Sequence, residues 1–196
     1  MLLALFTCFF TSCIPSIQPF YTTDLLTTSD ALAGDWVAEQ SEASEGELQL
    51  GTTINWKVKA MKDGSYRIRM ETDGKAGWFV GYLFRAGDHL LLDTTPGEGP
   101  ADEGLATCLD DMSEYHLLPL HHLWRVRFEG GRLHLDQLDP DWFEQALSTH
   151  QTDGLLHDTG DMQLFTASSE VLAAWLLRHA DEQGFWEEAL VLHPAG

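Results

Sequence analysis

The segment 114–124 concentrates histidines that could bind a metal ion. It reads EYHLLPLHHLW and contains His116, His121 and His122, three of the nine histidines in the chain. A catalytic zinc site needs three nitrogen or oxygen ligands that converge on one point, with a fourth position left open. Strand alternation would place His121 and His122 on opposite faces, and Pro119 separates them from His116. The spacing therefore favours structural histidines and no metal site, and a metal-dependent enzyme that uses this segment is the alternative hypothesis.

Four basic side chains form a second candidate site. Lys57 and Lys59 alternate with apolar residues in INWKVKA, and Arg67 and Arg69 do so in YRIRM. If the two runs pair as a hairpin, all four side chains lie on one face, where like charges directly opposite each other cost stability. An anionic ligand or partner would explain this arrangement. Acidic segments of the same chain that neutralise the face are the alternative explanation.

Two tryptophans form the third candidate site. Trp56 and Trp124 fall on the predicted inward faces of their strands, among other apolar residues. An eight-stranded barrel can hold one small ligand or can be filled by its own side chains. Trp56 and Trp124 therefore either line a pocket for a small apolar ligand or belong to a filled core.

The charge of the chain excludes one class of partner. With 11 basic and 31 acidic residues, the net charge is −20, whereas a nucleic-acid-binding protein needs a basic surface for the phosphates. The sequence also lacks a nucleophile elbow, a phosphate-binding loop and a dinucleotide-binding glycine pattern, and it indicates no cofactor. We therefore expect a non-enzymatic binding or envelope-associated module. A structural protein that acts through its acidic surface, with a protein partner, is a further alternative.

The first residues predict export. Residues 1–13 read MLLALFTCFFTSC, an apolar run followed by small residues that is typical of a secretory signal and too short to cross a bilayer. The tetrapeptide Phe10-Thr11-Ser12-Cys13 resembles the lipobox of bacterial lipoproteins. That resemblance implies a signal peptide over residues 1–12, acylation of Cys13 with fatty acids such as palmitate, and a membrane anchor. Ile14 follows the cysteine, so no inner-membrane retention signal is present, and we expect the protein on the periplasmic face of the outer membrane.

Alternation and turn residues predict two hairpins. A three-residue loop, 62–64, pairs Ala60 with Tyr66 and keeps the apolar faces of residues 53–60 and 65–70 together, with Gly64 in the left-handed position. A two-residue turn at Gly130-Gly131 pairs Val126 with Leu135 and Arg125 with Asp136. Further strands are expected at 35–39, 77–85, 89–94 and 162–166, which makes about eight strands.

The remaining sequence completes the predicted domain organisation. Residues 13–32 contain prolines and threonines and predict a lipidated tether, and residues 33–196 predict a single β-rich domain. Helices are expected near 140–150, where Asp139-Pro140 starts the first, and near 168–181. Gly34-Asp35-Trp36 resembles the first strand of lipocalins and fatty-acid-binding proteins, which implies a barrel with the tryptophan closing one end. The expected fold is mostly β (α+β): an antiparallel, up-and-down, barrel-like meander with two C-terminal amphipathic helices packed on it.

Overall fold

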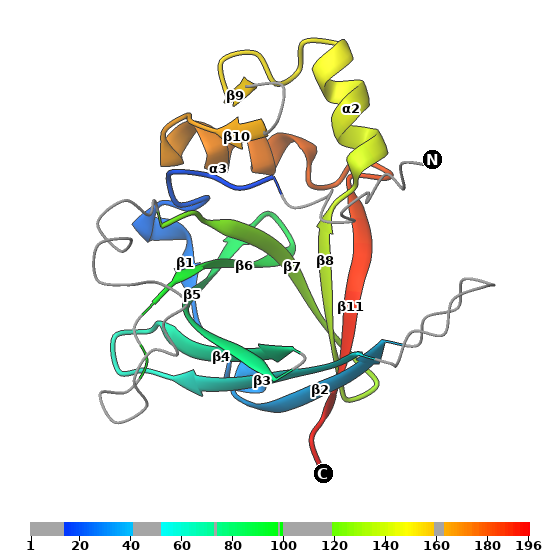
Figure 1. Ribbon diagram of the computed structural model, residues 1–196. Coiled ribbons are helices and arrows are strands. Elements are labelled where there is room, and N and C mark those ends of the chain that lie inside the picture. The colour runs from blue at the N-terminus through cyan, green and yellow to red at the C-terminus, as the bar shows by residue number, and fades with distance from the viewer. Residues whose placement is uncertain (1–13, 41–51, 73, 98, 100–118, 159–162) are drawn as a thin grey trace, which may run out of the picture.

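The structure is a computed structural model that describes residues 14–40, 52–72, 74–97, 99, 119–158 and 163–196 (Figure 1). The first elements are two 3-10 helices and six strands: η1 (Thr23–Leu25), β1 (Leu26–Thr27), η2 (Asp30–Leu32), β2 (Gly34–Gln40), β3 (Thr52–Ala60), β4 (Tyr66–Thr72), β5 (Lys75–Ala86) and β6 (His89–Pro96). The later elements are β7 (His122–Glu129), β8 (Arg132–Leu138), α2 (Pro140–Ser148), β9 (Leu156–Asp158), β10 (Gln163–Phe165), α3 (Ser169–His179) and β11 (Trp186–Pro194).

Eight antiparallel strands close into a barrel, as the alternating pattern predicts. Strands β2 to β7 each pair with the next strand along the chain, and β11 pairs with both β8 and β2. The long strand β5 pairs with β4 and β6, and near its end it also pairs with the short strand β1. Closure leaves the barrel without a free sheet edge, so every strand is paired on both sides.

The two predicted hairpins have the predicted register. Ala60 lies opposite Tyr66 and Val58 opposite Ile68, and Gly64 adopts a φ of 86° in the connecting turn. In the second hairpin, Val126 lies opposite Leu135, and both glycines of the turn have positive φ. A one-residue slip would turn the apolar side chains outward, which explains why the period-two pattern was sufficient to predict the register.

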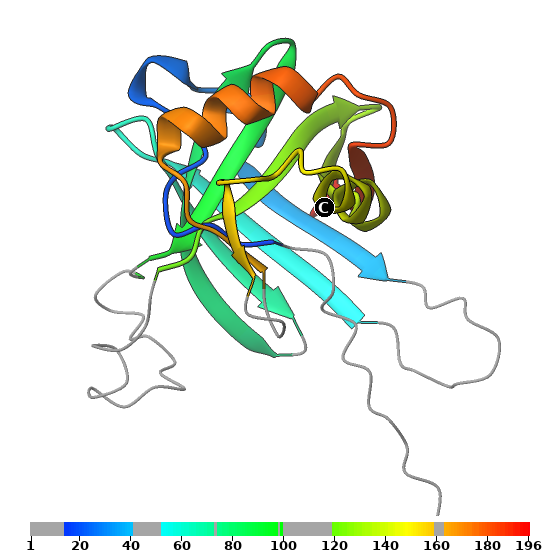
Figure 2. The ribbon, with the colours of Figure 1, turned by 90° about the horizontal axis from the view of Figure 1, so that it is seen from above.

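Buried apolar side chains form two clusters. The first fills the barrel interior and includes Trp56, Ile68 and Leu133. The second combines outward side chains of the barrel wall, such as Phe84, with side chains of both helices. Figure 2 shows α3 lying across the barrel, with α2 seen nearly end-on.

The eighth barrel strand is not the one that the sequence predicted. Residues 163–165 form β10, which pairs with β9 in a separate two-stranded sheet. The barrel is completed instead by β11, which follows α3, so both helices lie between the seventh and eighth barrel strands and not after the last one. The alternation of β11 is interrupted by a register shift between Glu188 and Leu190, and this irregularity hides its period of two.

Residues 14–32 do not form the expected tether. Phe20 is fully buried, and Ser16 forms backbone hydrogen bonds with His121 while Ile17 bonds to the carbonyl of Phe165. Leu32 is also fully buried. This segment therefore belongs to the folded domain, because burial of its apolar residues outweighs the entropy cost of ordering its backbone, a cost that its prolines reduce. Cys13 and the predicted signal lie outside the described residues.

The two helices begin close to the predicted positions. Asp139 caps α2, since its side-chain oxygen accepts a hydrogen bond from the backbone N–H of Trp142 at 2.8 Å, and Pro140 occupies the first turn. In α3, the side chains of Leu172 and Leu176 are completely buried, one helical turn apart.

Candidate functional site

One end of the barrel interior is closed by η2 and the start of β2. Leu32 is buried there, and its carbonyl accepts a hydrogen bond from Trp36 Nε1 at 3.0 Å. The hydroxyl of Tyr66 accepts a hydrogen bond from the backbone N–H of Ser29 at 2.7 Å and donates to the Ser29 carbonyl at 3.0 Å. Buried, hydrogen-bonded side chains thus fill this end.

The middle of the barrel is also filled. A Cβ atom added to Gly81 would lie 2.8 Å from Ile68 Cδ1 and 3.0 Å from Leu92 Cδ1, so an alanine there would require the ends of these two side chains to shift. Leu92 and Leu133, on neighbouring parts of the wall, are fully buried. This density is that of an ordinary protein core.

The opposite end of the barrel is the one at which β2, β4, β6 and β8 finish. Interior side chains are less completely buried at this end than in the middle of the barrel. We call it the accessible end, because several side chains of the interior cluster are only partly buried there. These side chains are Ile54, Met70, Phe79 and Trp124. Leu90, near the start of β6, and Leu190, in the middle of β11, are also partly buried members of the cluster.

Polar side chains also enter the interior at the accessible end. Alternation along β6, β7, β8 and β11 turns Thr94, His122, Gln137 and Glu187 toward the inside. Thr94 Oγ1 accepts a hydrogen bond from Trp124 Nε1 at 3.2 Å, and Gln137 Nε2 donates to Glu187 Oε1 at 2.6 Å. A mostly apolar site with a few placed hydrogen-bonding groups is the usual composition of a small-molecule site.

His122 is held in its neutral form at this end. Burial lowers its pKa below 6.5, the neighbouring His121 lowers it further, and Asp93 opposes both effects. At neutral pH its ring therefore offers one hydrogen-bond donor and one acceptor and carries no charge.

The two candidate tryptophans meet at the accessible end. Trp56 is 3% exposed, and its ring centroid lies 6.1 Å from that of the partly buried Trp124 in an edge-to-face arrangement. Sequence alternation predicts that Trp56 and Trp124 lie on the inward faces of two different hairpins. Closure of the barrel brings them together, and Trp124 presents the more accessible ring.

The four basic residues lie on the outside of the same strands. Lys57 is opposite Arg69, and Lys59 is opposite Arg67, as the predicted register requires. Both lysines are exposed, and Arg69 forms an ion pair with Glu71. The six candidate ligand-binding residues therefore divide into an inward pair of tryptophans and an outward basic face.

The histidines of segment 116–122 do not come together where the structure describes them. His121 Nδ1 lies 2.6 Å from Asp93 Oδ1 on the outer wall, whereas His122 faces inward, so the predicted divergence of this pair holds. His116 lies outside the described residues. Within the described ranges, no group of three histidine, cysteine or acidic side chains could hold a metal ion.

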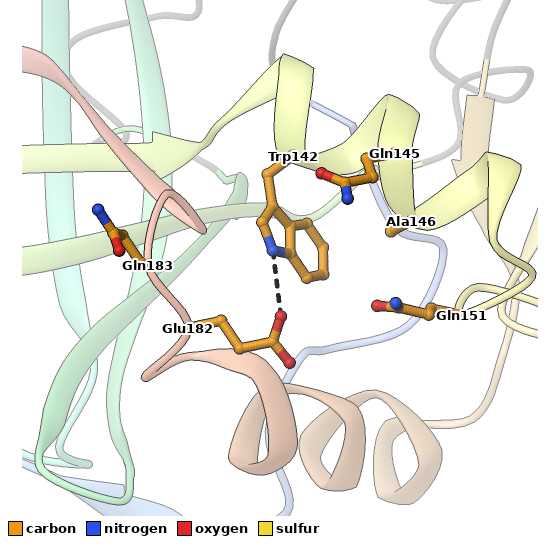
Figure 3. A pocket seen from close by; sticks show the side chains of 6 residues that line it. All are labelled: Trp142, Gln145, Ala146, Gln151, Glu182 and Gln183. Carbon is orange, nitrogen blue, oxygen red and sulfur yellow. Dashed lines mark hydrogen bonds between the residues drawn. The ribbon is translucent and has the colours of Figure 1, made fainter.

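A pocket between α2 and the turn after α3 has no counterpart in the sequence prediction. Its volume is about 360 Å3. The residues that line it are Trp142, Gln145, Ala146, Gln151, Glu182 and Gln183 (Figure 3). No sequence signal could have identified it, because scattered glutamines on a helix and in turns resemble an ordinary polar surface.

Comparison with known proteins identifies no relative of this chain: no family model, no curated protein and no solved structure matches it. Among the described helices, none has the length and apolar character needed to cross a membrane.

Proposed function

We propose that this protein is an exported, lipid-anchored, non-enzymatic binding protein that takes up a small molecule at the accessible end of its barrel. The observation that supports this function best is the change in the interior along the barrel. Apolar packing in the middle gives way to the inward hydrogen-bonding groups of Thr94, Gln137 and Glu187, beside Trp124. Thr94, Gln137 and Glu187 each have a hydrogen-bond partner in the protein, so they form a set of placed polar groups that the head of a ligand can also contact.

The chemistry of the accessible end defines the ligand class. Trp56, Trp124 and Phe79 provide an apolar, aromatic lining. Glu187 brings a carboxylate into the same region, and His122 is neutral. The proposed ligand is therefore amphipathic: its apolar part lies against the rings, and its head is a neutral or cationic hydrogen-bonding group.

A neutral fluorescent probe tests this proposal. N-phenyl-1-naphthylamine, titrated into the purified chain, should give a saturable increase in fluorescence. Replacing the inward Ile54 by tryptophan fills the accessible end and should weaken binding at least tenfold. The outward variant Thr53→Trp, one residue away on the exposed face, is the matched control and should bind like the wild type. Binding that is unchanged in Ile54→Trp, or an absence of saturable binding, would refute the proposal.

The proposal includes the packing of α2 and α3 on the outer wall as a fixed support for the barrel. It is supported by the single buried cluster that contains Leu172 and Leu176 of α3 and Phe84 and Leu91 of the wall.

A second candidate function is the binding of an anionic partner on the outward basic face. Among the described residues, no ion pair involves Lys57, Lys59 or Arg67. In a chain of net charge −20, such a face can be detected by retention on a cation-exchange resin. The double variant Lys57→Glu and Lys59→Glu should elute earlier than a control with the same change in charge, Lys62→Glu and Lys75→Glu. Equal elution of the two double variants would exclude a localised basic face.

A further inference from the structure

The pocket between α2 and the turn after α3 is a separate site from the barrel interior. Its walls come from α2, from the turn that follows α2, and from residues 182–183 (Figure 3). Buried residues of α2 and α3, such as Phe143 and Trp175, belong to the outer cluster and not to the interior one. The barrel wall therefore separates this pocket from the accessible end.

The backbone geometry of α2 and of the turn that follows it fixes the floor and one wall of this pocket. Trp142, Gln145 and Ala146 lie three and four residues apart on one face of α2. After the helix, His150 adopts a φ of 63°, and the backbone N–H of Gln151 then bonds to the carbonyl of Ala146 at 2.9 Å. This return of the chain brings Gln151 beside Ala146, whose small, buried side chain leaves the space that the pocket occupies.

A hydrogen-bonded set of side chains fixes the opposite wall. Glu182 Oε2 accepts a hydrogen bond from Trp142 Nε1 at 3.2 Å, and Glu182 Oε1 lies 2.6 Å from Nδ1 of the buried His179. The Trp142 ring also packs edge-to-face against Phe185, with centroids 4.5 Å apart. The indole and the carboxylate are therefore held in place before any ligand arrives, which reduces the entropy cost of binding.

Three amides of the pocket remain available for a ligand. In the part of the chain that the structure describes, no hydrogen bond involves the side-chain amides of Gln145, Gln151 or Gln183. Each amide offers two N–H donors and one carbonyl acceptor. Figure 3 shows that Gln145 and Gln151 come from different segments and lie on the same side of Trp142.

The charges around the pocket exclude two ligand classes. The carboxylate of Glu182 and the neighbouring Asp181 disfavour anions. A single lining carboxylate is too few ligands for a metal ion. The side-chain amides add neutral donors and acceptors beside the half-buried ring of Trp142.

We propose that this pocket binds a neutral carbohydrate the size of one or two hexopyranose rings. The hydroxyl groups of a sugar both donate and accept hydrogen bonds, as the amides of Gln145 and Gln151 on one side of Trp142 require, and the ring C–H groups pack against the half-buried Trp142. A volume of about 360 Å3 accommodates such a ligand. Since the lining glutamines are exposed to water, the affinity should be modest, with a Kd of roughly 1–10 mM.

Saturation-transfer NMR tests the proposal on the full chain with D-glucose, D-galactose, N-acetylglucosamine, maltose and cellobiose. At least one of these sugars should give a saturable signal. The double variant Gln145→Ala and Gln151→Ala should weaken that signal at least tenfold. The control Gln18→Ala, which removes an exposed glutamine elsewhere, should not change it.

The Ile54→Trp variant distinguishes this site from the barrel site. It should leave sugar binding unchanged while it blocks the naphthylamine probe. The proposal is overturned if none of the five sugars gives saturable binding, or if the double glutamine variant binds them as the wild type does.

Discussion

His121 and Asp93 form a close pair on the outer wall of the barrel, with 2.6 Å between His121 Nδ1 and Asp93 Oδ1. Asp93 is only 1% exposed, and its second carboxylate oxygen accepts a hydrogen bond from the backbone N–H of Phe20 at 2.9 Å. One carboxylate thus connects β6, the residue that precedes β7, and the N-terminal segment. The buried charge also affects Tyr21, whose pKa is raised first by its own burial and then by the proximity of Asp93.

Removal of this carboxylate should destabilise the fold. Asp93→Ala leaves the Phe20 N–H and the His121 ring without their buried partner, at an expected cost of about 3 kcal/mol in the free energy of unfolding. The control Glu144→Ala removes an exposed carboxylate from α2. It should change the free energy of unfolding by less than about 0.5 kcal/mol. Urea unfolding measures both values. Equal effects of the two substitutions would mean that Asp93 does not hold these segments together.

His122 should make stability depend on pH. Its folded pKa lies below 6.5, so below about pH 6.5 the unfolded chain binds more protons at this site than the folded chain does. The contribution of His122 to stability is therefore lost as the pH falls from about 6.5 toward the folded pKa, and it is constant at neutral pH and above. His122→Gln should decrease the loss of stability between pH 7.5 and 5.5, measured by urea unfolding. An identical loss in the variant would contradict the burial of this histidine.

Asp136 should be essential for the outward arginines of β7. It is completely buried, and its oxygens accept hydrogen bonds from Arg125 Nε at 2.7 Å and Arg127 Nε at 2.8 Å, which raises the pKa of Arg127. Asp136→Asn should cost about 2–4 kcal/mol in thermal or urea unfolding, because two guanidinium groups lose their buried counter-charge. Glu129→Gln removes an exposed partner of Arg127 and should cost less than about 1 kcal/mol. If Glu129→Gln lowered the free energy of unfolding more than Asp136→Asn does, the buried Asp136 would not be the main partner of these arginines.

The sequence was informative where a contact is local. The Arg125–Asp136 pair follows from a two-glycine turn and strict alternation, so its register could be predicted from residues a few positions apart. The pairing of Asp93 with His121 could not, because it depends on the alignment of β6 with β7 across 28 residues. Strand β11 was missed because its alternation is broken at the bulge.

In the candidate sites too, the local arrangement could be predicted from the sequence and the long-range contacts could not. Alternation correctly placed Trp56 and Lys57 on opposite faces of one strand, but only barrel closure brings Trp56 beside Trp124. The packing of residues 14–32 against the domain was not predicted, because prolines and threonines occur both in free linkers and in segments that pack against a domain.

The lipid anchor is tested by one substitution. Cys13→Ser removes the thiol to which the acyl chains would attach, and the protein should move from the membrane fraction to the soluble fraction. Because residues 14–32 belong to the folded domain, the anchored domain should lie close to the membrane, with no long spacer. Membrane fractionation that is unchanged in Cys13→Ser would refute the anchor, and it would leave the proposed barrel site unaffected.

Native mass spectrometry of the protein purified from its own host shows whether the accessible end of the barrel holds a small molecule. We expect a co-purifying small molecule that is neutral or cationic and partly apolar, present in the wild type and in Thr53→Trp and absent from Ile54→Trp. A ligand-free wild-type protein, or a molecule that stays bound in Ile54→Trp, would contradict binding at the accessible end of the barrel.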